Sequence, residues 1–186
     1  MEATLSSKEN YKENLKLAIL NESFDNWVSS FLLEINETIK RNGTIYIFGN
    51  GGSAANATHI ANDFTYAYQS DKYRVSIEAI CSNQAVITCL ANDIGYDNIY
   101  SYQLNNKASS GDLLVALSGS GNSPNILNAL QFGIDKKVRT LGIFGYDGGK
   151  ASKLVDSLIH IDYNDMQVAE DMQVIIAHAA LRAALQ

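Results

Sequence analysis

Hydrophobic positions divide the chain into a helical N-terminal region and a longer region of alternating strands and helices. From about Ser7 to Lys40, apolar residues recur at helical intervals, with a polar break at Asn21–Ser23. This spacing predicts one or two amphipathic helices. After Asn42, short apolar runs end at small residues and are followed by helical segments. The predicted strands are Thr44–Phe48, Tyr73–Ile77, Leu113–Leu117, Arg139–Phe144 and Ser157–Ile161.

Strands that alternate with helices predict an α/β fold, a five-stranded parallel sheet sandwiched by helices. Residues Gln167 to Leu185 contain no Gly or Pro and are rich in Ala, Ile and Val, which predicts a closing helix. The sequence contains no repeat, linker or low-complexity tract. We therefore expect a single domain over residues 1–186, with N-terminal helices in 1–41 and the α/β core with its closing helix in 44–186.

Charge and composition exclude several classes of function. The net charge is −6, which argues against a surface that binds nucleic acid or anionic lipid, because such surfaces need clustered Lys and Arg. A bound phosphate would have to be held mostly by neutral groups. The two cysteines, Cys81 and Cys89, show no zinc or redox spacing, and we expect free thiols. No apolar run approaches the ~18 residues of a membrane span and the first ten residues are polar, so we expect a cytoplasmic protein.

Glycine and serine concentrate at three predicted strand ends, where ligands bind in open parallel sheets. In Ser118-Gly-Ser-Gly-Asn-Ser123, serine hydroxyls and free backbone N–H groups predict a phosphate loop, and Pro124 opens the next helix. A polar turn with a serine helix cap is the alternative. The other two turns are Gly49–Ser53 and Gly145–Gly149.

The first turn also fits a dinucleotide-binding fingerprint. Gly49-Asn-Gly-Gly-Ser-Ala54 satisfies the G-x-G-x-x-A pattern, and Glu78 follows about 24 residues later, at the end of the second strand. This alternative does not account for a second phosphate loop after the third strand. A dehydrogenase would also need more chain for its substrate. We therefore rank it below a sugar phosphate site on the two loops Asn50–Ser53 and Ser118–Ser123.

At these loops the chain resembles SIS-domain phosphosugar isomerases, specifically the phosphoheptose isomerase group. The segments that carry the resemblance are Gly49–Ala55, His59, Ala91-Asn-Asp-Ile-Gly-Tyr96 and Leu117–Asn125. The resemblance implies a flavodoxin-like parallel sheet, a homotetramer, and conversion of sedoheptulose 7-phosphate to D-glycero-D-manno-heptose 7-phosphate. It also implies substrate-binding residues, here Asn50, Gly51, Gly52, Ser53, Asp93, Ser118, Gly119, Ser120, Asn122 and Ser123.

The resemblance further implies a reactive site that can hold Zn²⁺, at His59, Asp63, Glu170 and His178. Asp63 and Glu170 are the candidate bases for the proton on carbon, His178 the proton shuttle at oxygen, and His59 an orienting residue or metal ligand. His59 and Asp63 lie four residues apart, so both project from one helix face. An aldose–ketose isomerase needs such a base at carbon and an acid or metal at oxygen.

Four positions depart from the pattern of this group. Asp63 replaces Glu and Glu170 replaces Gln, while Ala67 and Gln167 stand where Arg and Asp are common. Two functions therefore remain open. The first is an isomerase of a sugar phosphate, favoured by His59 and His178. The second is a non-catalytic SIS module that binds a sugar phosphate, like a replication-initiation regulator that resembles this group.

Overall fold

The computed structural model describes residues 2–67 and 74–185, with side chains from residue 9 onward. The helices are α1 (Glu2–Ile19), α2 (Phe24–Lys40), α3 (Gly52–Ala67), α4 (Gln84–Ile94), α5 (Ile99–Lys107), α6 (Pro124–Lys136) and α7 (Met166–Ala184). The strands are β1 (Thr44–Gly49), β2 (Ser76–Ala79), β3 (Leu113–Ser118), β4 (Arg139–Phe144) and β5 (Ser157–His160). Two short 3₁₀ helices are η1 (Tyr96–Asn98) and η2 (Lys150–Lys153).

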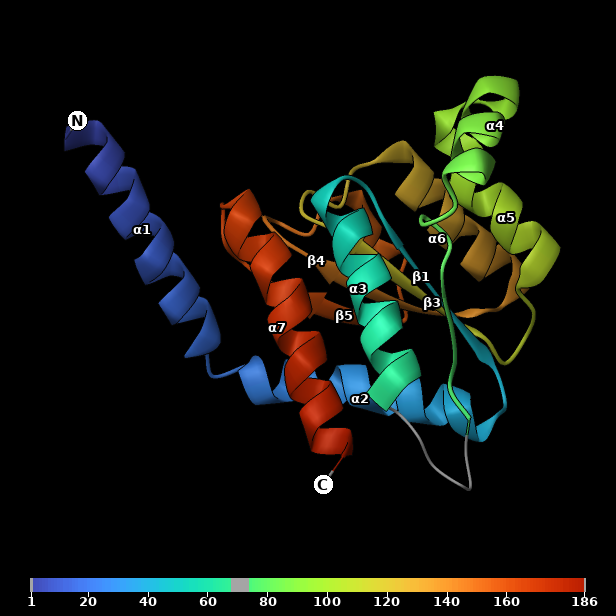
Figure 1. The fold of residues 1–186 in the computed structure, drawn as a ribbon, viewed down its shortest axis with the longest axis horizontal. Helices are drawn as coiled ribbons and strands as arrows, with labels where there is room; N and C mark the ends of the chain where they lie inside the picture. Colours follow the sequence, from blue (N-terminus) through green and yellow to red (C-terminus); the bar gives the residue numbers. More distant parts are fainter. Residues whose placement is uncertain (1, 68–73, 186) are drawn as a thin grey trace.

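The five strands form one parallel sheet in the order β2-β1-β3-β4-β5. This is the flavodoxin-like order, and it confirms the predicted fold class. Helices α2, α3 and α7 cover one face, and α5 and α6 cover the other (Figure 1). The N-terminal region forms two helices, where the sequence predicted one or two. The second half of α1 packs on the core through Tyr11, Leu15 and Ala18, and its first half extends away from the domain (Figure 1).

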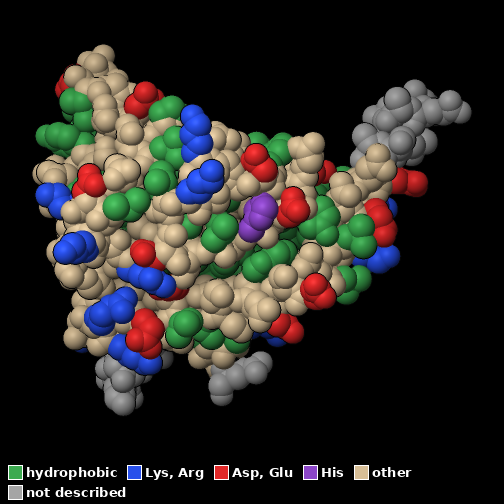
Figure 2. Space-filling view, turned by 180° about the vertical axis from the view of Figure 1, so that it is seen from behind, with side chains coloured by type: hydrophobic (Ala, Val, Ile, Leu, Met, Phe, Trp, Pro, Cys, Tyr) green, Lys and Arg blue, Asp and Glu red, His purple; other side chains and the backbone are tan. Residues whose placement is uncertain are grey.

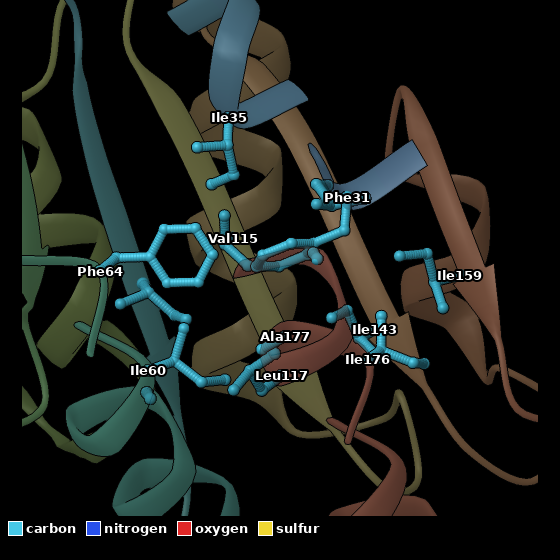
Figure 3. Close-up of a cluster of buried hydrophobic side chains, with 14 of the residues drawn as sticks. Phe31, Ile35, Ile60, Phe64, Val115, Leu117, Ile143, Ile159, Ile176 and Ala177 are labelled. Carbon is cyan, nitrogen blue, oxygen red and sulfur yellow. The ribbon is translucent and has the colours of Figure 1, made fainter. Parts of the chain in front are cut away.

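Alternate side chains of each strand enter opposite layers of the core, because successive residues of a strand point to opposite faces. Ile45 and Ile47 of β1 pack under α2, α3 and α7, whereas Tyr46 and Phe48 pack against α5 and α6. Figure 3 shows the first of these layers, with side chains of α2 and α3 lying on β3 and α7. Burial on both faces explains why the central strands read as continuous apolar runs.

The edge strand β2 is the element that the sequence places least well. Its prediction began at Tyr73, which lies outside the described residues, and ended at Ile77, whereas the strand continues to Ala79. Ala79 pairs with Ile47 of β1, so tertiary pairing sets the end of the strand. Glu78, within this strand, interrupts the apolar run that the other strands display.

The surface carries no dominant charge on the face that Figure 2 shows, where acidic and basic side chains are interspersed with hydrophobic ones. Within residues 2–67 and 74–185, no helix is both long enough and apolar enough to cross a membrane. The polar loops of the sheet lie at the carboxyl-terminal ends of its strands. Strands β1 and β3 are parallel neighbours, so their Gly/Ser loops lie next to each other beyond the carboxyl ends of the strands.

A partly buried ion pair holds α2 against the amino-terminal ends of β4 and β5. Glu34 is only 6% exposed, and its carboxylate accepts hydrogen bonds from Arg139, at 2.7 Å from Nη2, and from Ser157. Burial raises the pKa of Glu34, but the hydrogen bonds from Arg139 and Ser157 outweigh it and hold the pKa below its usual value. The ionised form of Glu34 therefore stabilises the fold.

We predict that Arg139→Met lowers the free energy of unfolding at neutral pH by about 1.5–3 kcal/mol, the range for hydrogen bonds to charged groups. A lowered pKa contributes stability above the ordinary carboxyl pKa, and that stability is lost as pH falls through the lowered value. The difference between the variant and the unmodified protein should therefore narrow in acid. Urea titrations at about pH 7 and pH 4 measure it, with Lys136→Met as the control for loss of a surface charge. A difference independent of pH would contradict the assignment.

Candidate functional site

The first glycine-rich loop turns from β1 directly into the N-terminus of α3. Gly51 adopts a φ of +55°, a conformation that glycine reaches without strain. The N–H groups of Ala54 and Ala55 bond back to the loop at Asn50 and Gly51. The N–H groups that precede them belong to the first turn of a helix, where no intrahelical acceptor exists, and such a turn binds anions.

In the second loop, two serine oxygens accept backbone hydrogen bonds. Ser118 Oγ accepts from the N–H of Gly121 at 3.0 Å, and Ser120 Oγ accepts from the N–H of Asn122 at 3.3 Å. A hydroxyl that accepts in this way keeps its own proton for another partner. Ser123 precedes α6 but makes no side-chain capping bond. The loop therefore does not use its last serine as a helix cap, the alternative that the sequence left open.

The two loops enclose one side of a cavity of about 260 Å³, which we call the phosphate mouth. Its lining residues are Asn50, Gly51, Gly52, Ser53, Leu117, Ser118, Gly119, Ser120, Ser123, Met166 and Glu170. No Lys or Arg is among these lining residues of the described chain. Eight of the predicted substrate-binding residues thus meet at one place, and the donors that they offer are neutral.

A pair of asparagines holds the two loops in register. Asn50 Nδ2 donates to Asn125 Oδ1 at 2.9 Å, and Asn125 Nδ2 donates back to Asn50 Oδ1 at 2.8 Å. The Tyr96 hydroxyl donates to the same Asn50 oxygen. Tyr100 donates to the main-chain oxygen of Gly49, and burial raises the pKa of Tyr100. Asn50 therefore positions the mouth as well as lining it.

The third glycine turn, Gly145–Gly149, contacts the second phosphate loop from behind. Asn122 Oδ1 accepts from the N–H of Lys150, and Asn122 Nδ2 donates to the main-chain oxygen of Ser120. A side chain at Gly121 would collide with the main-chain oxygen of Gly148. Asn122 was predicted to bind substrate, but its side chain fastens the loop to this turn and does not line the mouth.

A second cluster of functional side chains lies further along the same pair of helices. His178 Nε2 of α7 lies 3.0 Å from Asp63 Oδ2 and 3.0 Å from His59 Nε2, both on α3. His59 Nε2 lies 3.5 Å from the same Asp63 oxygen. We call these three residues the His–Asp–His cluster. Its histidine side chains are 48% and 46% exposed, so the cluster is open to a ligand.

The three ligand atoms face one another across a distance that suits one metal ion. Two atoms bound tetrahedrally at ~2.0–2.1 Å from Zn²⁺ lie about 3.4 Å apart, close to the separations found here. One imidazole proton cannot satisfy all three facing lone pairs, whereas a cation can. The described residues thus contain a possible metal-binding group at His59, Asp63 and His178.

Glu170, the fourth residue of the predicted metal set, is not part of this group. Its carboxylate lies over Gly52, where any side chain would collide with it, and it lines the phosphate mouth. Glu170 and His178 are eight residues apart on α7, which separates them by about 12 Å along the helix axis. The structure therefore brings three of the four residues together and puts Glu170 beside the phosphate loops.

Two other residues singled out in the sequence lie away from the mouth. The Asp93 carboxylate accepts hydrogen bonds from Cys89 and Asn92 on the exposed helix α4. Glu78, the acidic residue of the dinucleotide alternative, pairs with Lys107 at 2.5 Å and lines a separate cavity of about 210 Å³. Neither Asp93 nor Glu78 lines the phosphate mouth.

Several functional contacts carry no signal in the sequence. Asn125 and Tyr96 fall inside motifs that the sequence singled out, but their pairing with Asn50 is a tertiary contact. Met166 packs against Gly119, and Gln173 reaches Ser53 from the middle of α7. Only spacing within α7 could have indicated that Met166 and Gln173 share a face with Glu170.

Comparisons with known proteins identify the family and the fold. A family model described as SIS domain matches residues 28–145. The chain is 37% identical to a phosphoheptose isomerase from Aliarcobacter butzleri over 142 residues, 76% of this chain and 75% of the relative. It is 32% identical to a phosphoheptose isomerase from Helicobacter pylori over 90% of this chain and 86% of the relative. A phosphoheptose isomerase structure from Francisella tularensis superposes with a TM-score of 0.89 at 19% identity, covering 97% of each chain.

The position of Glu170 generates a prediction about anion binding. We predict that Glu170→Gln tightens the binding of inorganic phosphate about three- to tenfold, because like charges at a partly exposed site repel by about 1 kcal/mol. Calorimetric titration at low salt measures the change, which should shrink at high salt. Asp171→Asn is the matched control, since the Asp171 carboxylate accepts from Tyr11 outside the mouth. Weaker phosphate binding by Glu170→Gln would contradict the prediction.

Proposed function

This chain belongs to the SIS domain family, and we propose that it is a phosphoheptose isomerase that converts sedoheptulose 7-phosphate to D-glycero-D-manno-heptose 7-phosphate. The names of the curated relatives support this activity. The two functional clusters described above supply the parts that such an enzyme needs. We expect the enzyme to act in the cytoplasm.

The observation that carries the proposal is the spacing between the phosphate mouth and the His–Asp–His cluster. Gly52 and His59 are seven residues apart on α3, and Glu170 and His178 are eight apart on α7. These spacings correspond to about 10–12 Å along the helices. An extended seven-carbon chain places C1 roughly 10 Å from a phosphate on O7, at about 1.25 Å per bond. A heptose phosphate held at the mouth therefore reaches the cluster with its C1–C2 end.

The proposed chemistry moves one proton between adjacent carbons through an enediolate. The Asp63 carboxylate removes the proton from C1 of the ketose, and the same group returns it to C2. His178 Nε2, which lies against Asp63 Oδ2, passes protons between O1 and O2. His59 Nε2 contacts the same His178 nitrogen, at 3.0 Å, and helps to hold that imidazole against Asp63. The phosphate mouth holds the far end of the chain, so that C1 and C2 stay at the cluster throughout.

We propose further that His59, Asp63 and His178 are the protein ligands when one Zn²⁺ or similar ion is bound. The ion would then take the place of His178 Nε2 at the substrate oxygens, and Asp63 would keep its second carboxylate oxygen for the proton on carbon. Three protein ligands with one open position are typical of catalytic zinc sites. A bound ion would polarise the substrate carbonyl oxygen. In this arrangement the carboxylate of Glu170 remains in the phosphate mouth and is not needed as a ligand.

We predict that His178→Ala lowers kcat at least about 100-fold, the usual contribution of a positioned proton-transfer group. KM should change little, because the phosphate mouth is untouched. NMR measurement of the ketose and aldose signals over time follows turnover. His160→Ala is the matched control, since His160 Nε2 contacts the main-chain oxygen of Tyr146 away from the cluster. Full turnover by His178→Ala would exclude this mechanism.

Metal content is measured separately from turnover. Elemental analysis of zinc-loaded protein should find about one ion per chain in the unmodified protein and His160→Ala, and substantially less in His178→Ala. Equal zinc content in all three would exclude the proposed ligand set. Saturable binding of sedoheptulose 7-phosphate without turnover, in zinc-loaded protein, would favour the second function, a non-catalytic sugar phosphate module.

We also propose that the chain forms a homo-oligomer, most simply the homotetramer that the family resemblance implies. Leu17, Ile19 and Leu20, at the end of α1, are 47%, 40% and 69% exposed, and α4 buries none of its residues. Such apolar surface is typical of association sites. We predict a tetramer mass by light scattering at micromolar concentration and a smaller species for Leu20→Glu. Asn10→Glu, on the exposed part of α1, is the control. A monomeric unmodified protein would refute the proposal.

A further inference from the structure

A chain of side-chain amides connects α7 to the phosphate mouth through the interior of the domain. Asn56 Nδ2 donates to the main-chain oxygen of Glu170 at 2.9 Å and to Gln173 Oε1 at 3.0 Å. Gln173 Nε2 donates in turn to Ser53 Oγ at 3.1 Å. Gln173 is fully buried and Ser53 is 3% exposed. The described chain leaves no fully buried side-chain polar atom unpaired, so this relay is satisfied.

Each link of the relay can point in one direction only. A main-chain oxygen only accepts, so the Asn56 atom beside it must be the amide nitrogen. The second proton of that nitrogen requires an acceptor on Gln173, which is Oε1. The other end of the Gln173 amide is then the NH₂ group, and it faces Ser53. Ser53 Oγ is therefore an acceptor inside the protein, and its own proton is free for the mouth that it lines.

We propose that Gln173 and Asn56 are positioning residues that orient the Ser53 hydroxyl as a donor toward a phosphate in the mouth. The proposal rests on the proposed function, because it assumes that the mouth binds phosphate. Ser118 and Ser120 are oriented in the same sense, but by backbone N–H groups. Ser53 depends on side chains, so substitution can reverse its orientation without changing its own atoms.

Two nearly isosteric changes should reverse the relay from different ends. In Asn56→Asp, the new carboxylate cannot donate, so the Gln173 amide turns its NH₂ toward that carboxylate and its oxygen toward Ser53. In Gln173→Glu, the side chain presents an oxygen to Ser53 directly. In both variants the Ser53 proton bonds inward, and the mouth loses one donor. Each variant also adds a negative charge, which weakens anion binding whatever Ser53 does.

A double-mutant cycle with Ser53→Ala separates the hydroxyl from the charge. Calorimetric titration of inorganic phosphate is carried out on the unmodified protein, Ser53→Ala, Asn56→Asp and the double variant, at one pH and ionic strength. We expect Asn56→Asp to weaken binding about tenfold where Ser53 is present and no more than about twofold in the Ser53→Ala background. Equal losses in the two backgrounds would overturn the proposal.

The two substitutions differ in burial, so one of them remains a usable test if the other unfolds the protein. Gln173 is in the core, so the cycle with Gln173→Glu is interpreted only if its circular dichroism matches that of the unmodified protein. Asn56 is only half-buried, so Asn56→Asp is expected to fold. If Gln173→Glu does not fold, the cycle of Asn56→Asp with Ser53→Ala tests the proposal by itself. In steady-state assays, loss of a phosphate donor should raise KM more than it lowers kcat. A proportional loss of active protein, which lowers kcat and leaves KM unchanged, would contradict the positioning role.

The proposed function and this inference fail in different ways. If the unmodified protein neither binds phosphate saturably nor turns over sedoheptulose 7-phosphate, the proposed function fails and this inference fails with it. If phosphate binds and the two losses are equal, only the role of Gln173 and Asn56 is refuted.

Discussion

The whole site depends on the close packing of α3 against α7. The two helices run side by side over one face of the sheet, and at their N-terminal ends the Glu170 carboxylate lies in the space that a side chain at Gly52 would occupy. Asn56 and Gln173 join the helices in the middle, and the His–Asp–His cluster joins them further along. A small rotation of α7 would therefore disturb the phosphate mouth and the cluster together.

The phosphate mouth offers oriented serine hydroxyls rather than positively charged side chains, and the same hydrogen-bond arrangement recurs at three serines. A donor behind each of three serine oxygens occupies one lone pair, and the hydroxyl proton is left for the ligand. Backbone N–H groups supply that donor for Ser118 and Ser120, and Gln173 supplies it for Ser53. This arrangement fits the acidic composition of the chain, because it needs no cation at the binding surface.

The sequence predicts most of the fold and the chemistry of the loops, because both leave local patterns. Burial on two faces makes β1, β3 and β4 continuous apolar runs, and the Gly/Ser turns mark their ends. The sequence did not predict that β2 ends at Ala79, because the pairing of Ala79 with Ile47 of β1 sets that end. The four-ligand set had a different origin: the family resemblance implied it, whereas in this chain two helical turns of α7 separate Glu170 from the group of His59, Asp63 and His178. Gln173 and Asn56 have no local signature at all.

The described residues that line the mouth include no Lys or Arg, and this has a kinetic consequence. The attraction between an anion and a cationic side chain acts over many ångströms, but that of N–H and O–H dipoles fades within a few. An anionic sugar approaching this chain, whose net charge is −6, is not guided from a distance and is recognised only on contact. The negative charge of the chain repels the anion at long range, so added salt screens that repulsion and raises the encounter rate, the opposite of its effect on enzymes that attract anionic substrates.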